Sequence, residues 1–148
     1  MYMHLVTATE SLPQLPCVCT SMRRATRAVT RLYDQELREV ALRSTQFTLL
    51  QALRIAGTVT QGHLGSLLSL DSTTLTRSLQ PLLDAGWVKG MRGADRRERY
   101  LELTASGESK YQEALPAWRR AQNRLKKTIG RDWKWLESDL RKIAGSIT

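Results

Sequence analysis

Between residues 60 and 85, the sequence has the apolar spacing of two short helices joined by a tight connection. The first is predicted to begin at Thr60 and to bury a row of leucines. The second is predicted to begin after Asp71, because an aspartate side chain can accept hydrogen bonds from the free N–H groups of a first helical turn. Its inward face consists of Leu75, Leu79, Leu82 and Leu83. Two helices in this arrangement form the helix-turn-helix pattern.

The outer face of the second helix carries short polar side chains and one arginine. In a helix-turn-helix, this face lies in the major groove of DNA. Hydroxyl groups can reach phosphates or base edges, and an arginine can donate two hydrogen bonds to guanine. The alternative interpretation is that the face is merely solvated. The candidate groove contacts are Ser72, Thr73, Thr74, Thr76, Arg77 and Gln80.

An arginine-rich hairpin is predicted after the second helix, with strands at residues 87–91 and 99–103. A hairpin beside a recognition helix forms the wing of a winged helix, and arginine is favoured in narrow minor grooves. Asp95 would weaken phosphate binding unless it orients an arginine through a forked hydrogen-bond pair, so we interpret it as a positioning residue. The alternative is a solvated charge run. The candidate wing residues are Arg92, Asp95, Arg96 and, as the residue inserted into the minor groove, Arg97.

Longer helices are predicted on both sides of this unit. An apolar stripe formed by Val18, Met22, Ala25, Val29 and Leu32 predicts a helix over about residues 17–40. Ser44 is predicted to cap the next helix, which Gly57 ends. A long helical stretch is predicted from Thr104, with an interruption at Pro116, and Gly130 separates it from a last helix.

The predicted fold is therefore mainly α with a small two-stranded β wing, in the order α-α-α-α-β-β-α-α. Residues 1–43 are expected to hold an N-terminal segment and the first dimerisation helix. Residues 44–103 form the winged helix-turn-helix domain, and residues 104–148 form C-terminal dimerisation helices. A homodimer is predicted because the apolar positions of the first and last helices exceed what a small winged helix can cover.

Composition favours a polyanionic partner. The chain has 148 residues, 23 Lys and Arg against 14 Asp and Glu, and a formal net charge of +9. This length leaves no room for a two-domain enzyme, and its two histidines, His4 and His63, lie in no recognisable acid, base or metal spacing. We therefore predict neither an enzyme nor a cofactor. No apolar stretch approaches the roughly 20 residues of a membrane helix, and we expect a cytoplasmic protein without a membrane partner.

Cys17 and Cys19, at the start of the first helix, permit three interpretations. They can pack as small apolar side chains, sense oxidants or electrophiles, or join His4 in a metal site that would need a further ligand. Residues at i and i+2 of a helix point apart. An intrachain disulfide therefore requires non-helical backbone, whereas a bridge between subunits requires the two helix starts to approach within about 7 Å.

Three stretches together resemble the MarR family of bacterial transcription regulators: residues 64–70, the segment DSTTLTRSLQPLLDAGWV and the segment GADRRERYLELTASG. The family's D-x-R wing motif is followed by L-T-x-x-G at the start of the next helix. The matching positions here are Asp95, Arg97, Leu103, Thr104 and Gly107.

The resemblance implies a triangular homodimer whose two winged helices bind a palindromic DNA operator. It also implies a repressor that a small-molecule effector or cysteine oxidation releases from DNA. Arg77, Asp95 and Arg97 match the DNA-contacting positions of the family. The alternative function is a basic winged-helix module that binds DNA without sequence preference or binds a protein.

Overall fold

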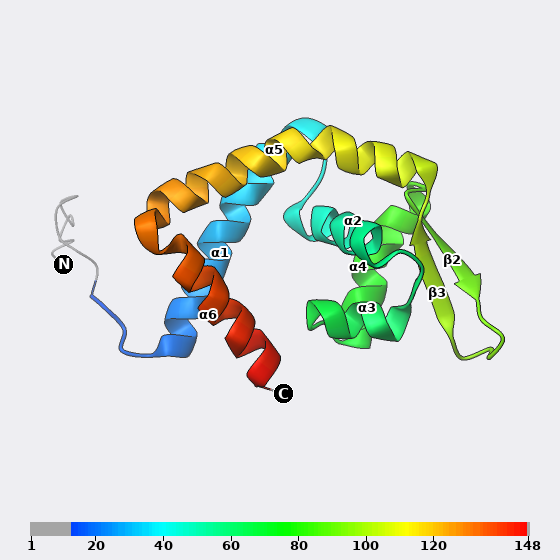
Figure 1. The fold of residues 1–148 in the computed structure, drawn as a ribbon, viewed down its shortest axis with the longest axis horizontal. Helices are drawn as coiled ribbons and strands as arrows, with labels where there is room; N and C mark the ends of the chain where they lie inside the picture. The colour runs from blue at the N-terminus through cyan, green and yellow to red at the C-terminus, as the bar shows by residue number, and fades with distance from the viewer. Residues whose placement is uncertain (1–12, 148) are drawn as a thin grey trace, which may run out of the picture.

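The computed structural model describes residues 13–147, and its helices build an arch (Figure 1). The long helix α5 spans the top, with α1 and α6 at one end and a small helical domain with a sheet at the other. The mainly helical fold with a wing is thus confirmed. The elements are α1 (Val18–Leu37), η1 (Arg38–Val40), α2 (Ser44–Ala56), β1 (Val59–Thr60), α3 (Gln61–Leu68), α4 (Ser72–Asp84), β2 (Val88–Arg92), β3 (Arg99–Leu103), α5 (Ala105–Ile129), η2 (Gly130–Asp132) and α6 (Trp133–Ser146).

The sheet has three strands rather than the two predicted. β3 lies in the centre and pairs antiparallel with β2 and with the short strand β1. Val59 of β1 lies opposite Leu101 of β3, and both side chains are buried. The third strand therefore fixes the base of the wing to the segment that leads into α3.

The core of the small domain forms where α2, α4 and β3 meet the first half of α5. The Phe47 ring stacks against Tyr111, with ring centroids 5.4 Å apart, and against Trp118, at 5.7 Å. Leu75, Leu79 and Leu82 of α4 are buried as predicted, and Leu83 is partly buried against the same core. This packing holds the opposite face of α4 toward solvent.

The helix boundaries predicted at Asp71 and Gly57 are confirmed, whereas the cap predicted at Ser44 is wrong. Asp71 caps α4, and Gly57 ends α2 with a φ of +69°, which favours glycine. Ser44, however, is the first residue inside α2, and Arg43 occupies the cap position. The Ser44 N–H donates to Asp34 Oδ1 at 2.7 Å, so a carboxylate of α1 satisfies one of the free amides in the first turn of α2.

The predicted interruption at Pro116 is also wrong, because α5 continues through this residue to Ile129. A proline inside a helix removes one backbone hydrogen bond. Ala114, Ala117 and Ala121 recur on one side of α5 and are fully buried against the rest of the fold. Burial on both sides of the proline accompanies a helix that stays continuous through this residue.

The segment Leu103–Gly107 locks the start of α5 to the base of the wing. The Thr104 hydroxyl accepts from the Gly107 N–H at 3.0 Å and donates to the Gly86 carbonyl at 2.6 Å. A Cβ atom on residue 107 would lie 2.0 Å from the Trp87 carbonyl oxygen. Only glycine permits this approach, which explains the L-T-x-x-G pattern in physical terms.

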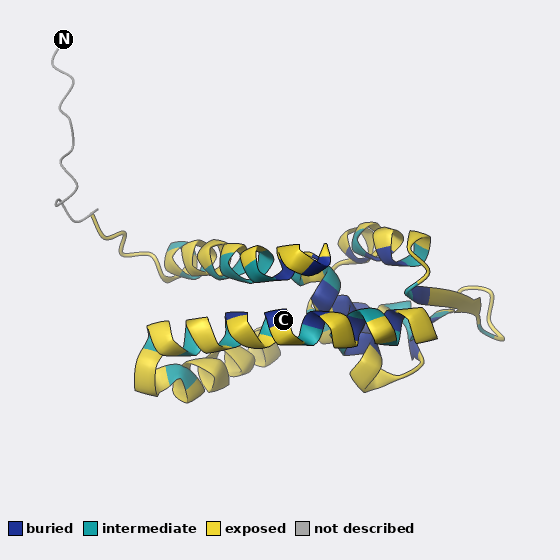
Figure 2. Ribbon diagram, turned by 90° about the horizontal axis from the view of Figure 1, so that it is seen from above, coloured by how far each residue is buried: buried dark blue, intermediate teal, exposed yellow. Residues whose placement is uncertain are grey.

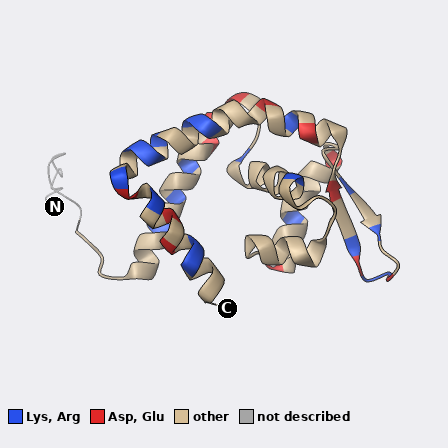
Figure 3. Cartoon of the chain, in the orientation of Figure 1, with Lys and Arg blue, Asp and Glu red and all other residues tan. Residues whose placement is uncertain are grey.

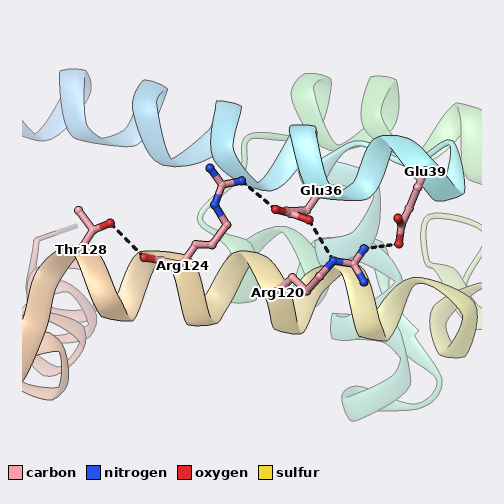
Figure 4. A network of polar contacts seen from close by, with 5 residues as sticks. All are labelled: Glu36, Glu39, Arg120, Arg124 and Thr128. Atoms are coloured by element: carbon pink, nitrogen blue, oxygen red, sulfur yellow. Dashed lines mark hydrogen bonds and ion pairs between the residues drawn. The ribbon is translucent and has the colours of Figure 1, made fainter.

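Ion pairs join α1 and η1 to α5 (Figure 4). Glu36 accepts from Arg120 Nε at 3.1 Å and from Arg124 Nη1 at 2.8 Å, and Arg120 also pairs with Glu39. The two arginines hold the pKa of the Glu36 carboxyl below its usual range. These contacts fix α1 alongside α5.

Candidate nucleic-acid interface

The outer face of α4 is presented by its cap and its buried leucines. Asp71 Oδ1 accepts from the Thr74 N–H at 2.8 Å, and Oδ2 accepts from the Thr74 hydroxyl at 2.7 Å. These bonds lower the pKa of Asp71. Thr74 is thereby engaged in the cap, and its hydroxyl retains only acceptor capacity for a ligand.

Two other predicted contacts on α4 also have partners within the chain. The Thr76 hydroxyl donates to the Ser72 carbonyl at 2.8 Å and accepts from Gln61 Nε2 of α3 at 2.9 Å. The Gln80 amide donates to Asp84 Oδ1 at 2.8 Å. Gln61 was not predicted from the sequence, because its contact depends on how α3 crosses α4.

The remaining predicted α4 side chains are exposed and free. Within the described part of the chain, Ser72, Thr73 and Arg77 take part in no side-chain hydrogen bond or ion pair. Thr73 and Arg77 are four residues apart and therefore share one side of the helix. The structure thus leaves one hydroxyl–guanidinium pair on α4 available to an external acceptor.

The wing gathers three arginines around a shallow cavity of about 480 Å³. Arg92 and Arg99 lie opposite each other in the β2–β3 pair, and Arg96 comes from the connecting loop. The Arg99 side chain lies across β2 at Gly90, where an added Cβ atom would be 2.7 Å from Arg99 Nε. Arg99 is thus held against the hairpin, a role that the sequence alone did not predict.

At the loop tip, the Asp95 carboxylate binds a different group from the arginine side chain that the sequence predicted. Asp95 Oδ1 accepts from the backbone N–H of Arg97 at 3.1 Å, and the Asp95 carbonyl accepts from the Glu98 N–H at 3.0 Å. Among residues 13–147, no guanidinium pairs with this carboxylate. The acid shapes the turn, and the Arg97 side chain stays exposed.

Cys17 and Cys19 are both exposed at the start of α1. Cys17 has extended backbone angles, φ −92° and ψ 118°, whereas Cys19 belongs to the first helical turn. The Thr20 hydroxyl, followed by the Thr20 backbone N–H, lowers the pKa of the Cys17 thiol. Residues 13–147 contain no cluster of three or more His, Cys, Asp or Glu suited to a metal, and His4 lies outside the described residues.

The fold and this surface define the chain as a winged helix-turn-helix protein. The sequence model of the MarR family matches residues 42–98. The HTH-type transcriptional regulator YwoH of Bacillus subtilis is 33% identical over 92 residues, which are 62% of this chain and 67% of that protein. The multiple antibiotic resistance protein MarR of Salmonella typhimurium is 36% identical over 78 residues, 52% of this chain and 54% of the relative. The aligned region thus spans about half of the Salmonella protein.

Solved structures extend the similarity beyond the winged helix. The M. tuberculosis transcriptional regulator MosR in complex with DNA is 34% identical, with a TM-score of 0.80 over 88% of this chain and 95% of that one. A mutant MarR from E. coli complexed with operator DNA is 26% identical, with a TM-score of 0.76 over 85% and 92%. The chain therefore belongs to the MarR family.

Proposed function

We propose that this chain is a transcription regulator that binds a palindromic DNA operator as a homodimer. The regulator of M. tuberculosis with the same fold is solved in complex with DNA. In this proposal, α4 enters the major groove and the wing reaches the adjacent minor groove. The proposed contacts are Ser72, Thr73, Thr74, Thr76, Arg77 and Gln80 on α4, and Arg92, Arg96 and Arg97 on the wing, with Asp95 positioning the loop.

The observation that carries this proposal is that the unbonded side chains of Thr73 and Arg77 lie on the same exposed side of α4. Arginine can donate a bidentate pair of hydrogen bonds to guanine, and threonine can contact phosphate or a base edge. Thr74, Thr76 and Gln80 already form hydrogen bonds within the chain. In this proposal, their main role is to hold the surface in shape, and their contacts with DNA are secondary. We propose no catalytic activity for this surface. We also propose that the regulator acts in the cytoplasm.

The homodimer is supported by apolar side chains that the single chain leaves uncovered. No residue of α6 is buried (Figure 2). Its exposed Leu136, Leu140 and Ile143 recur at intervals of four and three residues, on one side of the helix. Val18 at the start of α1 is 73% exposed. A second copy that covers these two helix faces would remove this apolar surface from water.

We further propose that oxidation of Cys17 and Cys19, or a small-molecule effector, releases the protein from DNA. Disulfide formation removes two electrons and two protons from a pair of thiols and transfers them to an oxidant. Exposure of both cysteines and the lowered pKa of Cys17 favour this reaction.

None of the helices within residues 13–147 combines the length and the hydropathy of a membrane-spanning segment.

Footprinting on DNA that flanks the gene for this protein tests the proposal. A palindromic footprint, with affinity for the operator exceeding that for random DNA by a factor on the order of 10³, is expected. Equal affinity for all duplexes would instead identify a module that coats DNA without sequence preference. Both readings predict salt-dependent binding, so the affinity ratio decides between them.

A further inference from the structure

A second basic surface lies on α1, far from the wing. It consists of Arg23, Arg24, Arg27 and Arg31, which are all exposed and are termed here the α1 arginine face. Arg23, Arg27 and Arg31 follow one another at intervals of four residues, about 6 Å apart along the helix axis. In Figure 3, basic residues mark both α1 and the wing, at opposite ends of the molecule.

Acidic residues do not neutralise this face. The sequence contains no Asp or Glu between Glu10 and Asp34. The Asp34 carboxylate accepts the Ser44 N–H, and Glu36 is paired with Arg120 and Arg124 of α5. In the described part of the chain, none of the four arginines forms an ion pair. The face therefore keeps its full positive charge.

Dimerisation through the apolar surface leaves the arginine face open. The apolar stripe of α1 begins at Val18 and includes Val29 and Leu32, which are half-buried. At 100° per residue, the arginines fall on the side of the helix opposite this stripe. A second copy that covers the stripe therefore leaves the arginines directed toward solvent.

The side chains of the α1 arginine face favour a phosphate backbone as its partner. All four cations are arginines, whose planar guanidinium groups match the oxygens of phosphate better than lysine does. Their neighbours on this side of α1 are small or polar, such as Thr20 and Thr30. A protein interface would have an apolar centre, and a membrane-binding helix would expose apolar residues beside its charges. Duplex DNA, with one charge per about 1.7 Å, supplies the complementary surface.

We propose that the α1 arginine face binds the backbone of a second DNA duplex, independently of its sequence, while α4 and the wing hold the first. α1 and the wing lie at opposite ends of the chain, so the two basic surfaces are separate (Figure 1). A bound dimer would therefore bridge two DNA segments. This activity is separate from recognition of an operator.

A two-step capture experiment tests the bridge. The full-length protein is bound to immobilised operator DNA, and a labelled duplex of unrelated sequence is then added. The wild type is expected to retain the second duplex. The triple variant Arg23→Gln, Arg27→Gln, Arg31→Gln is expected to bind the operator normally but to retain roughly tenfold less second duplex, with the salt slope of the second step lowered by about 3.

A matched triple variant distinguishes an effect of the α1 arginine face from a general effect of lowering the net charge. Arg119→Gln, Lys127→Gln and Arg131→Gln remove the same charge from exposed positions on α5 and η2, and should leave capture unchanged. Equal loss of capture in both triple variants would overturn the proposal, as would full capture by the α1 variant. The single variant Arg27→Glu repeats the test if the triple variant loses helix content. Operator binding in the first step reports separately on the proposed function.

Discussion

Asp95 Oδ1 accepts a hydrogen bond from the backbone N–H of Arg97 at 3.1 Å. The contact fixes the turn at the wing tip without using the guanidinium group, so the Arg97 side chain stays available to DNA. A carboxylate near phosphates is electrostatically unfavourable. Its presence is explained if the shape of the turn contributes more to binding than the charge costs.

Replacement of Asp95 separates these two effects. Asp95→Ala removes the acceptor and is expected to weaken operator binding about fivefold, because the turn loses a hydrogen bond worth about 1 kcal/mol. Asp95→Asn keeps an acceptor oxygen and removes the charge, so it should bind at least as tightly as the wild type. Fluorescence anisotropy at fixed salt measures both. Tighter binding by Asp95→Ala would show that charge alone matters.

Arg77→Ala is expected to cost roughly 1 to 3 kcal/mol against the preferred operator and to relax discrimination at one base pair, because a bidentate base contact is lost. Arg97→Ala should weaken binding mainly where the minor groove is narrow and rich in A·T pairs. Affinities for a panel of operator variants and random duplexes measure these effects. Uniform losses for both variants across all duplexes would indicate contacts to phosphate only.

The helices and the wing could be predicted because local patterns encode them. Asp71 and Gly57 act within one turn of the residues that they cap, and the leucines of α4 record which side is buried. β1 could not be predicted, since two residues carry no periodic signal and the strand exists only through pairing with β3. Pro116 misled the prediction because tertiary packing outweighs a local helix breaker.

The candidate site was predictable in its residue types but not in its contacts. The polar face of α4 was identified, but the partners of Thr76 and Gln80 depend on side-chain geometry that spacing does not specify. Asp95 was predicted to orient an arginine side chain, whereas its partner is the backbone amide of Arg97. The support of Arg99 by Gly90 depends on strand register across the hairpin.

Gly107→Ala is expected to destabilise the fold by roughly 1 to 3 kcal/mol, because its Cβ atom would overlap the Trp87 carbonyl and displace α5 from the wing. Gly145→Ala in α6 is the matched control. Its Cβ atom would meet nothing within 4 Å, and alanine favours helix by up to about 1 kcal/mol. Urea unfolding at one protein concentration measures both. Equal stability of the two variants would contradict the close approach.

Leu140→Glu is expected to dissociate the dimer, because it would bury an unpaired carboxylate in the apolar surface between subunits. Ser138→Glu introduces the same charge on another side of α6 and should leave the dimer intact. Sedimentation at low micromolar concentration measures the mass of each variant. A wild-type monomer with full helix content would rule out the dimer altogether.

The pKa of the Cys17 thiol lies below its ordinary value, with the Thr20 hydroxyl as the main cause. A lowered pKa populates the thiolate at a lower pH, so alkylation of Cys17 in a Cys19→Ser background should reach half its maximal rate below the ordinary thiol midpoint. Thr20→Val should move this midpoint upward, whereas Thr20→Ser keeps a hydroxyl and should not. Alkylation rates measured across a pH series test the assignment.

Oxidation should then connect this thiol to DNA binding. Diamide is expected to release the wild type from its operator, and nonreducing gels distinguish a bridge between subunits from one within the chain, because only the former doubles the mass. Cys17→Ser and Cys19→Ser should each prevent release if the two sulfurs bond to each other. If one variant still responds, a disulfide between two copies of the remaining cysteine is indicated. DNA binding that is insensitive to oxidant in the wild type would refute the redox switch and leave a small-molecule effector as the proposed signal.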